Sequence, residues 1–290
     1  MYGAADIPVL AGRCYVVTGA NSGIGAAASR LLAGQGAQVV LACRDKAKAA
    51  AAMADIHRQY PHAELDFVPL DLANLDAVRE AALLISQRYP RLDGMINNAG
   101  IARGQHVFAV NHLGHFALTM QLLPHLCKAG NARVVTVTSL AQRFGSTDWH
   151  DSIGNGFAAY CTSKRANLLF AVALQRYCDS RQWPVLSIAT HPGAVYTELS
   201  RQVVPTLFTL AAPLIRRLLN DVDAGALPLV RALTEPDLPE HMICTPAGFL
   251  ELVHSARFRP QQVDSQELHA AEALWQVSCE LTQLEESICG

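Results

Sequence analysis

The chain has 290 residues, of which 51% are hydrophobic and 17% are charged, and its formal net charge is −2. This length allows one large α/β domain or two small ones with a sizeable buried core. The nearly balanced charge gives no reason to expect nucleic acid or an anionic membrane as a partner.

Short apolar runs alternate with longer helical patterns along the chain. Strands are predicted over Cys14–Thr18, Gln38–Ala42, Leu65–Leu70, Gly94–Asn97, Arg133–Thr138, Val185–Thr190 and Met242–Cys244. Helices are predicted over Gly25–Ala33, Asp45–Tyr60, Leu75–Tyr89, His106–Leu126, Phe157–Cys178, Asp223–Leu233 and Gln266–Leu284. This alternation indicates the α/β class, a doubly wound (Rossmann) parallel sheet of about seven strands between two helix layers. No composition shift marks a second domain, so residues 1–290 are predicted to form one domain.

A glycine-rich turn directly follows the first predicted strand and opens a helix. Glycines permit a tight turn and a close approach of the backbone to a phosphate, and the helix N-terminus offers free N–H groups. This strand–turn–helix context favours dinucleotide binding over a flexible surface loop. The predicted contact residues of the turn are Gly19, Asn21, Ser22, Gly23, Ile24 and Gly25.

Tyr160 and Lys164 lie four residues apart in a predicted helix, so both side chains project from one face. A positive charge beside a phenol favours the phenolate, and we expect Lys164 to lower the pKa of Tyr160 from about 10. The pair predicts an acid/base group that works near neutral pH. Alone it is weak evidence, because the same spacing occurs by chance on many solvated helices.

The order of these motifs along the chain resembles the short-chain dehydrogenase/reductase family over about Arg13 to Thr197. The motifs are the glycine turn, Asn97-Asn98-Ala99-Gly100, Ser139, Tyr160-x-x-x-Lys164 and Pro192-Gly193. Longer phrases around 41–45, 111–116 and 191–193 are similar to the retinol dehydrogenase-like branch. That branch includes WW-domain oxidoreductase-like and protochlorophyllide reductase-like proteins.

The resemblance implies a role for further residues. Asp71, followed by Leu72, matches an acid that contacts the adenine ring, with an N-cap or turn residue as the alternative. Asn111 matches an asparagine that bends its helix and holds a water leading to the lysine, with a satisfied core asparagine as the alternative. His112, His115 and His191 are assigned to structure. The other implied cofactor contacts are Asn98, Ala99, Gly100, Pro192, Gly193, Val195 and Thr197.

Ser139 ends the fifth predicted strand, where its hydroxyl can bond the substrate oxygen that Tyr160 also touches. The gap from Ser139 to Tyr160 is longer than is usual in the family, though common in the retinol dehydrogenase-like branch. The predicted catalytic set is therefore Asn111, Ser139, Tyr160 and Lys164.

The end of the second strand predicts the cofactor. An NAD-binding fold usually places an acid there to hold the ribose 2′-hydroxyl. This chain has Cys43 followed by Arg44, and a guanidinium suits a 2′-phosphate. We therefore expect NADP(H), with NAD(H) less favoured; the alternative is that Arg44 is a solvated residue before a helix. The glycine turn lacks the basic residue that many NADP-using relatives carry.

The segment at about 196–222 is predicted to form a lid over the substrate. It is rich in Leu, Val, Phe and Ala, which favours an apolar small-molecule substrate. A surface helix packed on the body is an equally weighted alternative, and contact with a membrane surface is a weaker one. A homo-oligomer is possible, since relatives commonly pair through their two long helices, although monomers occur.

The cysteines and the apolar runs of the sequence indicate the cellular location that we expect for the protein. The eight cysteines form no C-x-x-C pair and no cluster with metal-ligand spacing, so we expect no metal and a reducing, cytoplasmic location. Neither a signal peptide nor a transmembrane segment is expected, because the first ten residues lack a basic region and the apolar run at 203–215 is short.

The resemblance and the residues together imply an enzyme that interconverts a carbonyl and an alcohol by hydride transfer, with Tyr160 as general acid/base. Three other functions stay open at this point. One is reduction of a C=C bond on the same scaffold. Another is nucleotide binding without turnover, as in a redox sensor, against which the complete serine–tyrosine–lysine set argues. The third is a nucleotide-sugar epimerase, for which the C-terminal portion is small.

Overall fold

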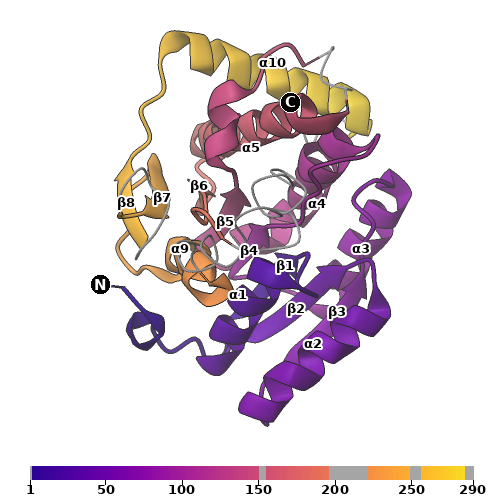
Figure 1. The fold of residues 1–290 in the computed structure, drawn as a ribbon, viewed down its shortest axis with the longest axis vertical. Helices are drawn as coiled ribbons and strands as arrows, with labels where there is room; N and C mark the ends of the chain where they lie inside the picture. Colours follow the sequence, from indigo (N-terminus) through magenta and orange to yellow (C-terminus); the bar gives the residue numbers. More distant parts are fainter. Residues whose placement is uncertain (1, 150–154, 196–220, 249–255, 285–290) are drawn as a thin grey trace, which may run out of the picture.

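The computed structural model describes residues 2–149, 155–195, 221–248 and 256–284, which form one eight-stranded sheet with helices on both faces (Figure 1). The strands are β1 Cys14–Thr18, β2 Gln38–Cys43, β3 Leu65–Pro69, β4 Gly94–Asn97, β5 Ala132–Val137, β6 Val185–Thr190, β7 Met242–Pro246 and β8 Ala256–Pro260. The helices are α1 Gly23–Gly34, α2 Lys46–Gln59, α3 Leu75–Arg88, α4 Gly114–Cys127, α5 Gly156–Ser180, α9 Val222–Thr234 and α10 Ser265–Thr282, with shorter turns η1 Ala4–Asp6, η2 Ala109–Leu113 and η3 Leu140–Phe144.

The strand order confirms the predicted doubly wound architecture. It runs β3-β2-β1-β4-β5-β6-β7-β8, and every pair is parallel except β7 with β8. The chain winds outward from β1 to β3, then returns to the centre and winds the other way from β4. The switch point therefore lies between β1 and β4, which is where open α/β sheets bind their ligands.

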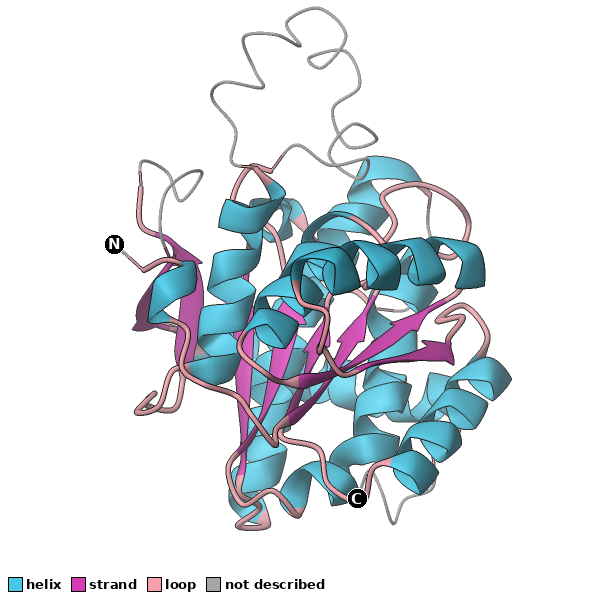
Figure 2. Cartoon of the chain, turned by 90° about the horizontal axis from the view of Figure 1, so that it is seen from below, coloured by secondary structure: helices cyan, strands magenta, loops and turns pink. Residues whose placement is uncertain are grey.

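Alternating side chains of the central strands fill two separate cores. In β1, Val16 lies in the core formed with α3, α4 and α5, while Val17 lies in the core formed with α1 and α9. Figure 2 shows the sheet between these two helix layers. Because both faces are buried, the strand is apolar along its whole length, which explains why it was recognisable in the sequence.

Strand β8 is the element that the sequence analysis missed. It pairs antiparallel with β7, Phe258 standing opposite Cys244, and forms the edge of the sheet. Along this strand apolar residues alternate with Arg257 and Arg259, and the strand ends in Pro260. Charged side chains and proline are common on edge strands because they discourage pairing with other chains. The same residues make the segment look like a polar loop in the sequence.

The long helix predicted over His106–Leu126 is interrupted by the π-helical turn η2, after which α4 begins at Gly114. A Cβ atom on Gly114 would lie 2.4 Å from the carbonyl oxygen of Leu72, so glycine is needed for α4 to approach the end of β3. The turn contains Asn111, the residue that was expected to bend the helix.

Helix α10 packs along α5 and contacts α4 on the outer side of this layer (Figure 1). Trp275 stacks on Tyr177, with ring centroids 4.7 Å apart, and lies edge-on to Phe116 at 5.2 Å. Arg165 of α5 pairs with Glu267 at 2.6 Å. Part of the α4 and α5 surface is therefore covered within the chain itself.

His112 joins this layer to α10. Its Nε2 lies 2.8 Å from Ser278 Oγ, whose hydroxyl donates to the carbonyl oxygen of Leu274, so the histidine is the donor. Burial and the neighbouring His115 lower the pKa of His112 to about 3.

This buried histidine makes the fold sensitive to acid. The unfolded chain protonates it near pH 6.5 but the folded chain only near pH 3, so its contribution to stability is complete above 6.5 and declines as pH falls. Between pH 6.5 and 5 the loss is about 2 kcal/mol for this side chain. Urea unfolding at several pH values should show a shallower decline for His112→Leu than for the wild type. The matched control is His62→Leu at an exposed position, and an equal decline in all three proteins would contradict the prediction.

Candidate active site

Six strands end level with one another at the carboxyl edge of the sheet. The register pairs Thr18 with Ala42, Cys43 with Pro69, and Val137 with Thr190. The predicted site residues follow these strand ends or lie on the helices beside them. The edge therefore gathers segments that are far apart in the sequence, as in dinucleotide-binding folds.

The glycine turn packs tightly against the loop that follows β4. A Cβ atom on Gly25 would lie 2.4 Å from the Gly19 carbonyl oxygen and 2.5 Å from Asn98 Nδ2, and one on Gly19 would lie 2.9 Å from Ala99 Cα. Gly19 also has a φ of 64°, in the left-handed region. Only glycine fits either position without displacing backbone.

The N-terminus of α1 is open for an anion. Ser22 is the N-cap residue, yet its side chain makes no capping hydrogen bond. Gly23 and the partly buried Ile24 form the first turn, and Asn21 precedes them, partly buried. Free N–H groups at a helix start, beside a cradle that only glycine fits, suit the pyrophosphate of a dinucleotide. The predicted cofactor residues therefore fit the group at this end.

The ends of β2 and β3 form the neighbouring wall. Cys43 is buried, whereas Arg44 is exposed directly after it, at the N-terminus of α2. Asp71 accepts a hydrogen bond from the backbone N–H of Ala73, so it shapes the turn as well as facing the edge. Leu72 is buried beneath it, against Gly114.

Tyr160 and Lys164 lie on one face of α5, as predicted. Lys164 Nζ is 5.9 Å from the centroid of the Tyr160 ring. Both residues are buried, with Lys164 2% and Tyr160 6% exposed. The expected lowering of the tyrosine pKa is wrong for this structure. Burial raises the pKa of Tyr160 to about 12, and a hydrogen bond with Ser139 opposes that rise. The phenol therefore stays protonated at neutral pH.

Ser139 lies where the sequence placed it, at the end of β5 and within hydrogen-bonding reach of Tyr160. Its Oγ also accepts from the backbone N–H of Ala141 at 3.3 Å, which caps η3. The described part of the gap to Tyr160 packs against α5: a Cβ atom on Gly145 would lie 2.5 Å from the Cys161 carbonyl oxygen. The serine and the tyrosine are close together although the segment between them is long.

A main-chain carbonyl oxygen at the end of β5 holds the Lys164 side chain in the site. Its Nζ donates to the Val137 carbonyl at 3.0 Å, and the same oxygen accepts from Asn167 Nδ2 at 3.0 Å. Thr138 Oγ1 donates to the Lys164 carbonyl at 2.7 Å, which anchors the backbone of this turn to β5. Burial lowers the pKa of Lys164 to about 8.

Asn111 uses its side chain to brace the loop after β4. Its Oδ1 accepts from Ile101 N at 2.8 Å, and its Nδ2 donates to Ile101 O and to Ser163 Oγ, both at 2.9 Å. A Cβ on Gly100 would lie 3.3 Å from Asn111 Oδ1 and 3.7 Å from Lys164 Nζ. The structure therefore brings Asn111, Gly100 and Lys164 together, with the asparagine amide occupied by protein groups.

The loop after β6 completes the edge. The Gly193 N–H donates to His191 Nδ1 at 3.1 Å, and Gly193 adopts a φ of 78°. Pro192 is partly buried, and Val195 is buried against Gly225 of α9. Thr197 and nearly all of the lid predicted at 196–222 lie outside the described residues.

Sequence reasoning missed three groups that hold the site together. Thr18 Oγ1 accepts from the N–H groups of Asn98 and Ala99, and Asn167 shares the Val137 carbonyl with the lysine. His115, assigned only to structure, contacts both Thr18 and Asn111. Its position four residues after Asn111 was the one available signal, since residues four apart on a helix share a face.

Known proteins of one family match this chain. A sequence profile described as short chain dehydrogenase matches residues 13–207. The chain belongs to the short-chain dehydrogenase/reductase family. It is 39% identical to dehydrogenase/reductase SDR family member 13 of Bos taurus over 95% of this chain and 74% of that protein, and 33% identical to retinol dehydrogenase 12 of Homo sapiens over 94% and 87%. A crystal structure of an uncharacterized protein from Mycobacterium paratuberculosis has a TM-score of 0.79, with 33% identity over 98% of both chains.

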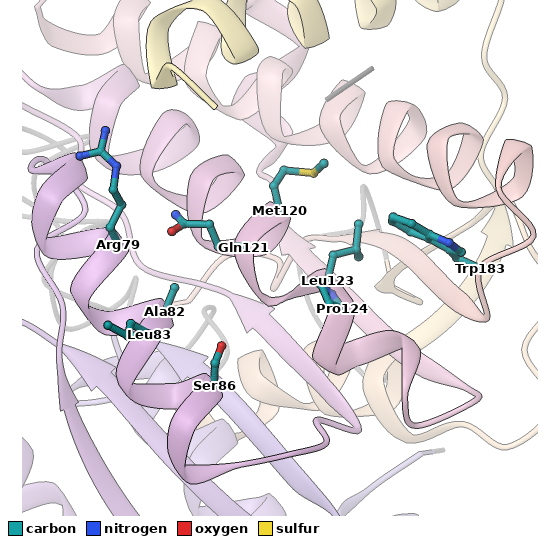
Figure 3. Close-up of a pocket in the computed structure, with 9 residues that line it drawn as sticks. All are labelled: Arg79, Ala82, Leu83, Ser86, Met120, Gln121, Leu123, Pro124 and Trp183. Carbon is teal, nitrogen blue, oxygen red and sulfur yellow. The ribbon is translucent and has the colours of Figure 1, made fainter. Parts of the chain in front are cut away.

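Two hollows of this short-chain dehydrogenase/reductase differ in their relation to the site. One of about 480 Å³ lies between the loop at 102–105 and the start of α5, one helical turn from Tyr160. The other, of about 340 Å³, lies between α3, α4 and Trp183 (Figure 3). The second is lined by residues of α3 and α4 and by Trp183, and by none of the predicted site residues.

None of the helices in the described part of the chain combines the length and apolar character needed to cross a membrane.

The close approach at Gly100 makes it a sensitive position in this oxidoreductase. The methyl group of Gly100→Ala would press on Asn111 Oδ1 and crowd Lys164 Nζ. We expect kcat to fall about ten-fold or more, because small displacements of catalytic groups are costly. Steady-state kinetics on purified variants would measure the change, with Gly3→Ala, where a Cβ meets only Asp6 at 3.9 Å, as control. Unchanged turnover of Gly100→Ala would contradict the geometry proposed for this corner.

Proposed function

We propose that this protein is an NADP(H)-dependent oxidoreductase that interconverts a carbonyl and an alcohol on an apolar small molecule. The observation that carries the proposal is the group formed by Ser139, Tyr160 and Lys164 at the switch-point edge. A serine hydroxyl within hydrogen-bonding reach of a tyrosine hydroxyl marks where a substrate oxygen would accept two hydrogen bonds. When bound, the nicotinamide cofactor supplies or accepts the hydride.

Tyr160 is suited to act as the proton donor in the reducing direction. Its raised pKa keeps the phenol protonated at neutral pH, so it can donate to the oxygen of a carbonyl that is gaining negative charge. Ser139 would orient the same oxygen. In the oxidising direction Tyr160 must act as base, and the raised pKa then favours activity at higher pH.

Lys164 supplies positive charge at the root of the group. Below its pKa of about 8 the buried ammonium stabilises negative charge on the tyrosine oxygen after proton transfer. One of its N–H groups is directed to Val137 O, which leaves two for the nicotinamide ribose. The lysine would therefore position the cofactor and assist the tyrosine.

Arg44 supports NADP(H) over NAD(H). It is exposed at the end of β2, where Cys43 is buried and provides no carboxylate for a ribose 2′-hydroxyl. A guanidinium in that position can form charge-assisted hydrogen bonds to a 2′-phosphate.

The surroundings of Tyr160 support an apolar substrate. The hollow of about 480 Å³ beside it is lined in part by Ala102 and Phe157, and the Phe157 side chain is 50% exposed. Ala102 and Val107 form a buried apolar cluster with Tyr160. Apolar pockets with a few polar groups bind small apolar ligands.

A cytoplasmic location belongs to the same proposal. It is supported by the seven cysteines of the described residues, all of which are free thiols. Reducing compartments maintain cysteines in that state.

Replacement of the tyrosine tests the reaction. We expect Tyr160→Phe to lose about 10²–10⁴-fold in kcat, because it removes the proton donor, and to bind NADPH with unchanged affinity. NADPH oxidation would be followed with ketones, aldehydes and enones, and cofactor affinity by fluorescence. Tyr15→Phe, at a buried tyrosine of β1, is the control and should retain full turnover. Turnover by Tyr160→Phe at the wild-type rate would refute the assignment, and turnover of enones alone would favour C=C reduction.

Replacement of the arginine tests the cofactor. Arg44→Ala should weaken NADPH binding about ten-fold, since a hydrogen bond to a charged group is worth about 1.5–3 kcal/mol, and leave NADH binding unchanged. Titration calorimetry with both cofactors measures the difference. Arg58→Ala, in the last turn of α2, removes an exposed arginine elsewhere on this helix and is the control. Equal affinity of Arg44→Ala and the wild type for NADPH would show that another residue selects the cofactor.

A further inference from the structure

His115 of α4 connects two parts of the site that lie on different elements. The residue is 1% exposed and lies in the first turn of α4, just after the π turn η2. Its Nδ1 lies 3.0 Å from the Asn111 carbonyl oxygen, and its Nε2 lies 2.8 Å from Thr18 Oγ1. One imidazole thus contacts both the segment that carries Asn111 and the end of β1.

These partners determine where the ring proton lies. A carbonyl oxygen can only accept, so Nδ1 carries the hydrogen and donates to Asn111. In the neutral ring Nε2 is then an acceptor. The Thr18 hydroxyl, which also faces the Ile96 carbonyl oxygen at 3.2 Å, donates to Nε2 at the shorter distance of 2.8 Å. Burial and the nearby charge of Lys164 lower the pKa of His115 to about 4, which keeps the ring neutral.

The Thr18 hydroxyl connects the ring to the Asn98–Ala99 segment, which is the cofactor wall. Its oxygen accepts from the N–H groups of Asn98 at 2.9 Å and of Ala99 at 3.0 Å. Asn98 Nδ2 also donates to the Thr18 carbonyl at 2.9 Å and lies against Gly25 of the glycine turn. These hydrogen bonds connect the His115 ring, through the Thr18 hydroxyl, to the Asn98–Ala99 segment.

We propose that His115 is a positioning residue which, as the Nδ1–H tautomer, links the Asn111 carbonyl to Thr18 and so sets the distance between the cofactor wall and Lys164. The proposal rests on the proposed function for its effect on turnover, but not for its effect on cofactor affinity or for the tautomer. Loss of the ring would release the Asn98–Ala99 segment and the π turn together. Both cofactor affinity and kcat would then decline.

His112 offers a matched comparison on the same stretch of helix. It is equally buried, three residues earlier. Its Nε2 is directed to Ser278 of α10, and its ring also lies near Asn167, but it contacts neither Thr18 nor the Asn111 carbonyl. His112→Leu and His115→Leu both remove a buried imidazole at similar cost in packing. If His115 only fills space, the two variants will differ in neither kcat nor NADPH affinity.

Glutamine can restore part of the link. In the same helix Gln121 Nε2 donates to the Ala117 carbonyl four residues earlier, at 2.9 Å. A glutamine at position 115 can reach the Asn111 carbonyl in that way, and its oxygen is free to accept from Thr18. His115→Gln should therefore keep more activity than His115→Leu.

The test compares wild type, His112→Leu, His115→Leu and His115→Gln in NADPH affinity and in kcat. We expect His115→Leu to lose about ten-fold in each, His115→Gln to recover most of both, and His112→Leu to match the wild type. Thr18→Val should resemble His115→Leu, and the double variant should lose no more than the worse single one, because both remove the same chain. Equal values for His112→Leu and His115→Leu, or additive losses in the double variant, would overturn the proposal.

Nitrogen-15 NMR of the imidazole in the wild type provides a readout that needs neither turnover nor a variant that folds. Signals of a protonated Nδ1 and an unprotonated Nε2 are expected between pH 6 and 8, and the opposite tautomer would overturn the proposal. Absence of NADPH turnover in the wild type would refute the proposed function, whereas affinity and tautomer would still decide the role of His115.

Discussion

The burial of the Lys164 ammonium is the constraint on which the rest of this site depends. Removing a charge from water costs several kcal/mol, and within the described residues no carboxylate lies close enough to pair with it. The lowered pKa of about 8 reflects that cost. The fold offsets part of it with the Val137 carbonyl and holds the backbone of the lysine through Thr138. A buried cation of this kind favours partners that bring negative charge, such as the oxygen of a tyrosine after proton transfer, or that accept its hydrogen bonds, such as the hydroxyls of a sugar.

The sheet places this charge beside a cradle for a dinucleotide. Because the winding direction reverses between β1 and β4, the helices α1 and α4 lie on opposite faces of the sheet, and open α/β sheets bind their ligands at such a point. Gly19 and Gly25 let the first loop pack on the second, and Gly100 lets the second pack on the Asn111 and Lys164 pair. Three positions without a Cβ thus bring three backbone segments closer together than other residues would permit.

Local patterns carried most of what the sequence could predict. Central strands such as β1, β2 and β5 were recognisable because they are apolar along most of their length, and the glycine turn and the Tyr160–Lys164 pair depend on spacing within one segment. The features that escaped depend on distant neighbours. Strand β8 exists because β7 offers it an edge, and its two arginines conceal it. The pKa of Tyr160 rises because residues from several elements bury the phenol, which no spacing between two residues can indicate.

The histidines of α4 and its π turn show how one helix can connect the scaffold with the site. An extra residue in a helical turn rotates the side chains before it relative to those after it, and such π turns are frequent at functional sites. Here His112 lies within the π turn and reaches α10, while His115 lies beyond it and reaches β1. Asn111, directly before His112, is held by Ile101 and Ser163. The aromatic packing of Trp275 against Phe116 stabilises the side of this helix that faces α10. Stability in the outer layer and geometry at the site are therefore properties of the same segment.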